Sequence, residues 1–361
     1  MRDIPRLTLA AAIYLACILG SFGNVAFSGP GAAPGSPQKT LTIAEEFNVP
    51  IAELSGLAIT RTLKDKSGNG SVGTGGESIN LYAVGDASYE IARFRIDGAS
   101  GAAIINAQDV ADIVRERKAD TSQWEAIATD GRDTLCILSE SGSEISCLDH
   151  RLEHHRGSFT LDVSSIGHLN AAWKARPNSR GEGMILMKKG HVLVLKEKQP
   201  AMLIEFGPEG DSPMGYGPAA FLQDDEEFTG LRTDFEEPIV YRANRATFPF
   251  QRRLVALKTW EFSEHLRELA TDASEIALGP DGSVYLLSQE SATLIRLQKI
   301  LKPDEDKVSL DRGAYWNLPA GLEKAEGLAI DDDMHPWIGI DIKQASKPNL
   351  FRLSPIDASP E

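Results

Sequence analysis

Acidic and hydroxyl side chains recur at one position of a phrase that is repeated five times in this sequence. Alignment of residues 53–58 with four later segments gives one column, which holds Ser55, Glu125, Glu182, Ser274 and Glu326. A small or acidic residue follows each of them, and an apolar run comes next. Converging oxygen atoms suit a hard cation such as Ca²⁺, which takes about six to eight oxygen ligands. The column predicts a candidate metal site with Glu125, Glu182 and Glu326 as ligands.

A second set of acidic residues follows the next apolar run of each repeat. In an antiparallel pair, the end of the second strand lies beside the beginning of the first. We therefore expect both sets to lie at one rim of the molecule. The second set comprises Asp86, Glu140, Glu197 and Glu290, with Asp341 as a less regular member.

Crowded carboxylates are compatible with three roles, which the sequence leaves open. They could bind a cation, act as catalytic acids and bases, or form a structural network with serines and backbone amides that plugs a channel. Without a cation, such carboxylates must raise their pKa values or pair with bases. Lys196, Lys198 and Lys324 lie close to them in the sequence and could provide that pairing.

The repeat also predicts the elements that position these side chains. Each phrase begins one short apolar run, and further runs follow at intervals near the length of a four-stranded blade. Asp130-Gly131 and Asp281-Gly282 stand between such runs, which is typical of hairpin turns. The prediction is an all-β protein with a β-propeller fold of five blades, with six as the alternative. The first strand of each blade would line the central channel.

Two long irregular segments interrupt the repeat. Residues 62–77 are rich in Gly, Ser and Lys, and residues 207–237 are rich in Gly, Pro, Asp and Glu. We interpret both as loops rather than domains. The second would be a candidate lid if it covered the acidic rim.

Three further runs predict strands near the ends and in the middle of the chain. We expect 254–257 and 260–262 to be outer strands of the blade that follows the long loop. The run 349–353 should pair near the first strand, predicted at 40–43, and thereby close the ring and remove its exposed edges.

The beginning of the chain predicts an export signal. Arg2 and Arg6 precede an apolar run at 7–19 and then a Gly- and Pro-rich stretch, the order of a secretory signal peptide. A membrane anchor is the alternative, because 7–27 is just long enough to span a bilayer. We expect an exported protein, periplasmic or secreted, with a leader at 1–28, a linker at 29–38, one propeller domain at 39–356 and a tail at 357–361.

Two cysteines remain after the leader, and their spacing suggests a pair. Cys136 and Cys147 would lie opposite each other in a hairpin that folds about Ser141-Gly142. Directly opposed residues are within disulfide reach, and export would permit oxidation. Two small core residues on neighbouring strands are the alternative.

The other reactive residues give weaker signals. His150, His154 and His155 have a spacing that could bring metal ligands together, although a solvated connection between blades fits them better. The net charge of −15 and the lack of a basic stripe argue against nucleic-acid binding. No Gly-x-Ser-x-Gly elbow or phosphate-binding loop occurs.

Several phrases occur in an order that resembles a known family. They are Glu53–Leu57, Trp124–Ala128, Leu195–Pro200, Leu286–Ser291, Ala325–Ala329 and Pro348–Leu353. In this order they resemble the SdiA-regulated family of bacterial exported β-propellers and, more distantly, phytase-like esterase propellers. The resemblance covers about 53–355 and implies a five-bladed propeller, but it brings no established reaction. The turn at 341–347 is longer than the short turn usual in that family.

Two functions follow as predictions. The first is a non-catalytic protein of the cell envelope that binds a cation, a small ligand or an envelope partner at an acidic channel rim. The alternative is a calcium-dependent phosphoesterase or esterase-like hydrolase, in which the three glutamates hold Ca²⁺ while a bound water attacks. In both, contact with a membrane would require an uncleaved leader.

Overall fold

The computed structural model describes most of the chain after the predicted leader. The described residues are 39–60, 79–96, 103–114, 121–176, 179–223, 226–229, 251–343 and 346–357. All of them belong to one compact unit that spans 35–361. The predicted leader at 1–28, the linker at 29–38 and the loop at 62–77 lie outside the described residues.

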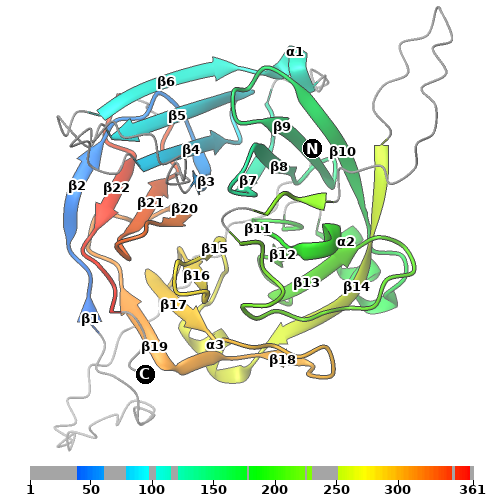
Figure 1. Cartoon of the computed structure of the whole chain (residues 1–361). Coiled ribbons are helices and arrows are strands. Elements are labelled where there is room, and N and C mark those ends of the chain that lie inside the picture. The colour runs from blue at the N-terminus through cyan, green and yellow to red at the C-terminus, as the bar shows by residue number, and fades with distance from the viewer. Residues whose placement is uncertain are drawn as a thin grey trace, which may run out of the picture. The chain divides into compact units, whose positions relative to one another are not determined.

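The described strands form five four-stranded antiparallel groups, or blades, around a common centre (Figure 1). The first blade contains β3 (Leu54–Thr60), β4 (Ile79–Gly85), β5 (Glu90–Ile96) and β6 (Ala103–Asp109). The second contains β7 (Trp124–Thr129), β8 (Thr134–Ser139), β9 (Glu144–Asp149) and β10 (His155–Asp162). The third contains β11 (Gly183–Leu186), β12 (Val192–Lys196), β13 (Met202–Gly207) and β14 (Gln251–Phe262).

The remaining two blades use strands from both ends of the chain. The fourth contains β15 (Glu275–Leu278), β16 (Val284–Ser288), β17 (Thr293–Leu297) and β19 (Leu310–Asn317). The fifth contains β20 (Ala325–Ile330), β21 (Pro336–Ile340), β22 (Leu350–Leu353) and β2 (Ile43–Phe47). The short strands β1 (Lys39–Thr40) and β18 (Lys307–Val308) extend the outer edges of β19 and β14.

Helices are few and short in the described part of the chain. They are α1 (Ala111–Val114), α2 (Gly167–Ala175), α3 (Glu264–Leu269) and the 3₁₀ turn η1 (Lys188–Gly190). In the described ranges, no helix has the length and apolar character needed to cross a bilayer.

The inner strands β3, β7, β11, β15 and β20 contact one another in turn, and β20 contacts β3. Their side chains alternate between the two neighbouring blades. In β11, for example, Ile185 packs in one apolar cluster with Ile276, whereas Met184 and Leu186 pack in another with Ala128. Because both faces of each blade are covered, these strands are continuously apolar rather than alternating. This arrangement confirms the predicted all-β propeller class.

The ring closes where the two ends of the described chain meet. Strand β2 pairs in antiparallel fashion with β22 and becomes the outer strand of the fifth blade. The predicted pairing of the last strand with the beginning of the chain is therefore confirmed, although the pairing strand is β2 at Ile43–Phe47 and Thr40 belongs to β1. Asn349 reinforces the closure: its buried side chain accepts from Val49 N at 2.8 Å and donates to the carbonyls of Val49 and Ile51.

One prediction about the outer strands is wrong. Residues 254–257 and 260–262 are parts of a single strand, β14, and this strand completes the third blade rather than forming two outer strands of the fourth. Its length explains the difference. One part of β14 pairs with β13, and its beginning extends far enough to pair in parallel with β10 of the second blade.

The hairpin of β8 and β9 has the register that the cysteine spacing suggested. Cys136 lies opposite Cys147, with a Cα–Cα distance of 4.0 Å, and the two side chains form a disulfide. Both residues are buried in the cluster between the second and third blades. The disulfide therefore joins two strands that already pair.

Replacement of Asn349 by alanine should weaken the closure of the ring. The change removes three buried hydrogen bonds to the backbone, which should lower the free energy of unfolding by about 3 kcal/mol. Urea unfolding of Asn349→Ala and wild type measures the difference. Asn349→Asp is the matched control, because it keeps the acceptor oxygen and loses both donor bonds. Equal midpoints for Asn349→Ala and wild type would show that the side chain has no role in closure.

Candidate functional site

The repeated column of Ser and Glu residues lies on β-bulges at the beginning of the inner strands. In β7, Trp124 pairs with Ser139 and Ala126 pairs with Leu138, so Glu125 is an extra residue. Ser55 in β3 and Glu326 in β20 have the same position between two paired residues. A bulge turns the extra side chain out of the normal alternation. These side chains are thereby released from the packing between blades.

The other two members of the column have equivalent positions. The N–H of Glu182 donates to the carbonyl of Leu195, although Leu195 pairs with Gly183. Likewise, Ser274 N donates to Leu287, which pairs with the residue after Ser274. All five repeats therefore place two residues opposite one at the same end of the inner strand.

The acidic rim consists of this column and the acidic residues that follow the second strands. Burial and repulsion from Glu140 raise the pKa of Glu125 to about 8, and Asp86 and Glu326 add to that repulsion. Burial and repulsion from Glu125 raise the pKa of Glu182 well above its usual range. Side chains from the first, second, third and fifth blades therefore influence one another across the channel mouth.

Two carboxyl pairs in this rim share hydrogen bonds. Glu182 bonds to Glu140, and Glu53 bonds to Asp86. Burial and the neighbouring Glu53 carboxyl raise the pKa of Asp86 to about 6. A hydrogen bond between two carboxyl groups requires a proton on one of them. The raised pKa values of Glu125, Glu182 and Glu326 therefore let the rim keep protons that solvent-exposed carboxylates would lose at neutral pH.

The nearby lysines neutralise only the outer part of the rim. Lys198 Nζ lies 2.5 Å from Glu197 Oε1, and Lys324 pairs with Asp341. Lys196 is buried and donates to the carbonyl of Lys198 at 2.5 Å, and burial lowers its pKa. In the described ranges, no lysine or arginine forms an ion pair with Glu125 or Glu182.

Some predicted rim residues have other tasks. Ser55 is buried and donates to the Trp124 carbonyl at 2.5 Å, which links β3 to β7. Ser274 Oγ accepts from Gln289 N at 3.0 Å. Glu290 is exposed, and its carboxylate lies 3.8 Å from Lys198 Nζ. The two serines are thus occupied by the backbone, and Glu290 lies at the solvent edge of the rim.

Glu326 lies at the side of the rim formed by the fifth blade. Burial and repulsion from Asp341 raise its pKa to about 8. Gln289 Nε2 donates to Glu326 Oε1 at 3.2 Å. The longer turn that begins at Asp341 therefore contributes directly to the electrostatics of the rim.

Sequence reasoning missed Glu275, which follows Ser274 in β15. Gly or Ala has this position in the other four repeats. Glu275 is 1% exposed, its Oε1 accepts from Ile276 N, and its Oε2 has no hydrogen-bond partner. Burial raises its pKa well above the usual range, and Glu125 adds repulsion. The sequence did contain a signal for this residue, because Glu275 is acidic at a position where the other repeats have Gly or Ala.

Gly183 shows why Glu275 fits into the packed centre. A Cβ atom at Gly183 would lie 2.5 Å from Glu275 Oε1, so the glycine makes the space for this carboxyl group. Further unpartnered buried oxygens belong to the rim itself, namely Asp86 Oδ1 and Asp341 Oδ1. In the described part of the chain, no three His, Cys, Asp or Glu side chains form a ready-made metal site.

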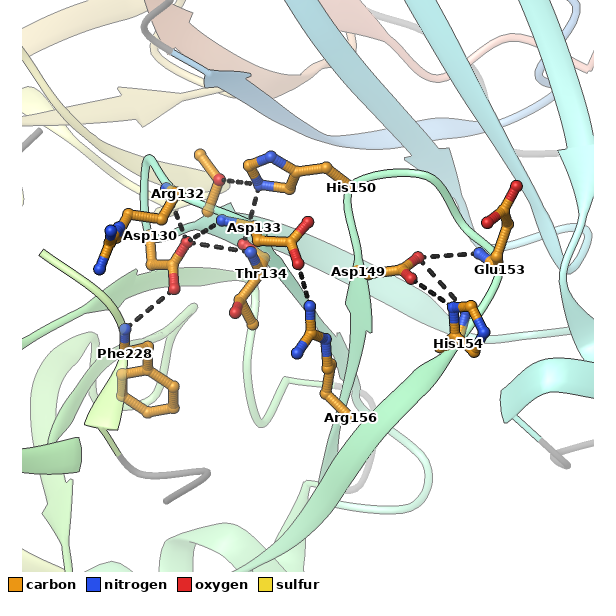
Figure 2. Close-up of polar contacts among 11 residues, drawn as sticks. Asp130, Arg132, Asp133, Thr134, Asp149, His150, Glu153, His154, Arg156 and Phe228 are labelled. Atoms are coloured by element: carbon orange, nitrogen blue, oxygen red, sulfur yellow. Dashed lines mark hydrogen bonds and ion pairs between the residues drawn. The ribbon is translucent and has the colours of Figure 1, made fainter. Parts of the chain in front are cut away.

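The histidine triplet of the second blade does not form a joint site, and Figure 2 shows His150 and His154 with different partners. His150 Nε2 lies 2.8 Å from Thr129 Oγ1, whereas His154 Nδ1 lies 2.7 Å from Asp149 Oδ2. His155 bonds within its own strand, β10. The three rings thus have separate partners. The predicted connection between blades is wrong, because this segment joins β9 to β10 within the second blade.

A second missed feature is a buried acid–base network in the third blade. His191 Nδ1 lies 2.6 Å from Glu205 Oε1, and its Nε2 lies 3.1 Å from Asp211 Oδ2. Glu205 also accepts from the N–H groups of Met214 and Gly215. Burial lowers the pKa of His191, but the hydrogen bonds to the two carboxylates outweigh this effect and raise it. The network fixes the loop that follows β13.

The long loop after β13 does not cover the acidic rim in its described parts. Phe221 pairs with Met187, which follows the end of β11, and Phe228 N donates to Asp130 just after β7. Both contacts lie at the end of the channel opposite the bulges. The described parts, 207–223 and 226–229, thus give no support to a lid over the rim.

Neither a protein-family model nor a curated protein matches the sequence. Similar solved structures include a streptogramin B lyase, with a TM-score of 0.40 and 11% identity over 86% of this chain and 96% of that chain. A gluconolactonase from Xanthomonas campestris has a TM-score of 0.38 and 11% identity over 90% of each chain. A PQQ-bound aldose sugar dehydrogenase from Streptomyces coelicolor has a TM-score of 0.40 and 10% identity over 88% and 99%. At these identities the likeness concerns the fold alone, and the SdiA-regulated resemblance remains a prediction from motifs.

The acidic rim should make the protein less stable as pH rises. Glu125 and Glu326 have folded pKa values of about 8, above their ordinary value of 4.5. The folded state therefore binds more protons than the unfolded state between these values, and the free energy of unfolding should fall as pH rises through that window. Urea unfolding at pH 5.5 and 8.5 in metal-free buffer measures the effect.

Glu182→Gln tests whether the rim causes this dependence. The variant should be more stable than wild type at pH 8.5, where the carboxyl is costly to ionise, and close to wild type at pH 5.5. Glu46→Gln, on the exposed face of β2, is the matched control. The same pH dependence in wild type and both variants would assign it to groups outside the rim.

Proposed function

We propose that this propeller binds a cation at its acidic rim, with Ca²⁺ as the metal candidate and a protonated amine as the organic equivalent. The carrying observation is the cluster of Glu125, Glu182 and Glu326, placed by bulges of three blades at one channel mouth without a paired lysine or arginine among the described residues. A bound cation would relieve the repulsion that protons now relieve.

Buried carboxylate oxygens without hydrogen-bond partners, in the rim and at Glu275, are a second observation in support of this proposal. Glu275 Oε2, Asp86 Oδ1 and Asp341 Oδ1 are buried without a hydrogen-bond partner. Such groups cost free energy unless a ligand, ion or water satisfies them. All are hard carboxylate oxygens, which Ca²⁺ prefers over nitrogen or sulfur ligands.

Cation binding at this site would compete with protons. Burial and repulsion from neighbouring carboxylates raise the pKa values of Glu125 and Glu326 to about 8, so these groups hold protons near neutral pH. A cation that takes the place of these protons would release them into solution. Binding should therefore be tighter at pH 8.5 than at pH 5.5, and it should release protons near neutral pH.

Thermal unfolding and calorimetry test this proposal. After treatment with EDTA, CaCl₂ at about 100 times its Kd should stabilise the protein by about 2.7 kcal/mol. Calorimetric titrations in buffers of different ionisation enthalpy should detect proton release. Glu182→Gln should bind at least tenfold more weakly, and Glu46→Gln should bind as wild type does.

The same experiments distinguish a metal cation from an organic cation as the ligand of the rim. A shift with a protonated amine such as putrescine and none with Ca²⁺ or Mg²⁺ would support an organic cation. No shift with any of these probes at either pH would contradict the proposal and favour a rim stabilised by its own protons.

The hydrolase alternative has one supporting observation. Burial raises the pKa of Glu140 but the hydrogen bond with Glu182 limits this rise, whereas burial raises the pKa of Glu182 well above its usual range. Two carboxyl groups whose pKa values differ are the arrangement used for acid and base catalysis. If the alternative holds, phosphate esters or lactones should turn over with Ca²⁺ present, and Glu182→Gln should lower kcat at least 100-fold. No turnover by the calcium-loaded protein would leave only the binding function.

A further inference from the structure

A cavity lies at the end of the channel opposite the acidic rim. Its volume is about 130 Å³, and all five inner strands contribute to its wall. Leu57, Ile127, Met184, Ile276 and Leu328 are buried lining residues, one from each strand. The cavity is therefore built by the same convergence of strands that builds the rim.

Small side chains leave the space for this cavity. The repeat that carries Ser or Glu on the bulge carries alanine three residues later in four blades, at Ala58, Ala128, Ala277 and Ala329. Ile185 has that position in the fifth. All five residues line the cavity and are buried. This column is as regular as the acidic column and lies three residues further along each repeat.

The burial pattern shows where the cavity opens. Leu57 and Ile127, nearest to the middle of the channel, are buried, whereas Ile59 and Leu278, at the strand ends, are only half-buried. Leu222 lines the same end and is also half-buried. Among the described residues, the opening thus faces away from the acidic rim.

The polar side chains at this cavity are few, and the charged one already has hydrogen-bond partners. Asp130 Oδ1 accepts from the N–H groups of residues 132–134, and its Oδ2 accepts from Phe228 N at 2.9 Å (Figure 2). Four donors hold this carboxylate, so it has no need of a cationic ligand. Thr129 and Gln223 are the uncharged polar side chains of the lining.

We infer that this cavity is a second binding site, which takes a small neutral apolar molecule with a single aromatic ring or a short alkyl chain. A cavity of about 150 Å³ lined by aliphatic side chains is large enough for benzene. A charged ligand would lose its hydration among these side chains without gaining an ion partner. The site has the opposite chemistry to the acidic rim, and its occupancy does not depend on cation binding there.

Toluene is the probe for this site, and benzoate is its charged counterpart of similar size. Ligand-observed NMR titration of the purified protein should show saturable binding of toluene and none of benzoate. Ala128→Leu should weaken toluene binding at least tenfold by filling the cavity. Ala107→Leu makes the same change on the exposed strand β6 and should leave binding as in wild type. Toluene binding that does not saturate, or that is equal in the two variants, would overturn the inference.

A second variant tests the site by enlarging it. Ile185→Ala should allow the two-ring probe naphthalene to bind at least threefold more tightly than it binds wild type. Glu182→Gln, at the other end of the same strand, should leave toluene and naphthalene binding unchanged. Equal naphthalene affinity in Ile185→Ala and wild type would also overturn the inference, even if Ala128→Leu failed to fold.

Discussion

Pairing of β2 with β22 closes the ring of blades, and the geometry of both channel ends depends on it. The pairing joins residues about 300 positions apart in the chain, as the Val49–Asn349 contact shows. Once closed, the ring leaves each inner strand no freedom to move away from the axis, because a neighbouring blade packs on each side. Side chains on the bulges must then lie close together, whatever their charge.

Closure therefore has an electrostatic cost at the rim. Carboxylates that would separate in an open sheet are held near one another. Burial and mutual repulsion therefore raise their pKa values, and Glu140 and Glu182 form a hydrogen bond. Lysines lower the cost only at the periphery, at Glu197 and Asp341. Strongly shifted carboxyl pKa values of this kind cluster at functional sites in proteins.

Because all inner strands run in the same direction along the channel, the two ends of the channel carry different kinds of side chains. Every inner strand begins with a polar bulge and ends in aliphatic residues, so the five beginnings form an acidic mouth and the five ends form an apolar cavity. The histidine-linked loop after β13 lies at the apolar end, where Leu222 and Gln223 join the lining. One repeat thus gives the two ends of the channel unlike chemistry.

The sequence by itself determined the propeller class, the five inner strands, the acidic column and the opposed cysteines. These are local or periodic features, and a repeat displays them directly. It did not determine that β14 spans the edges of two blades, because strand partners far apart in the chain leave no local mark.

The tertiary structure also decided which side chains of the acidic column bond to the backbone and which contact other carboxyl groups. Ser55 and Ser274 bond to the backbone, whereas Glu182 forms a side-chain hydrogen bond with Glu140 from another blade. Glu275, in a column of small residues, acquires its buried position only because Gly183 leaves room beside it. Burial and pKa depend on neighbours that closure of the ring brings together, and those neighbours are set by three-dimensional packing rather than by spacing along the chain.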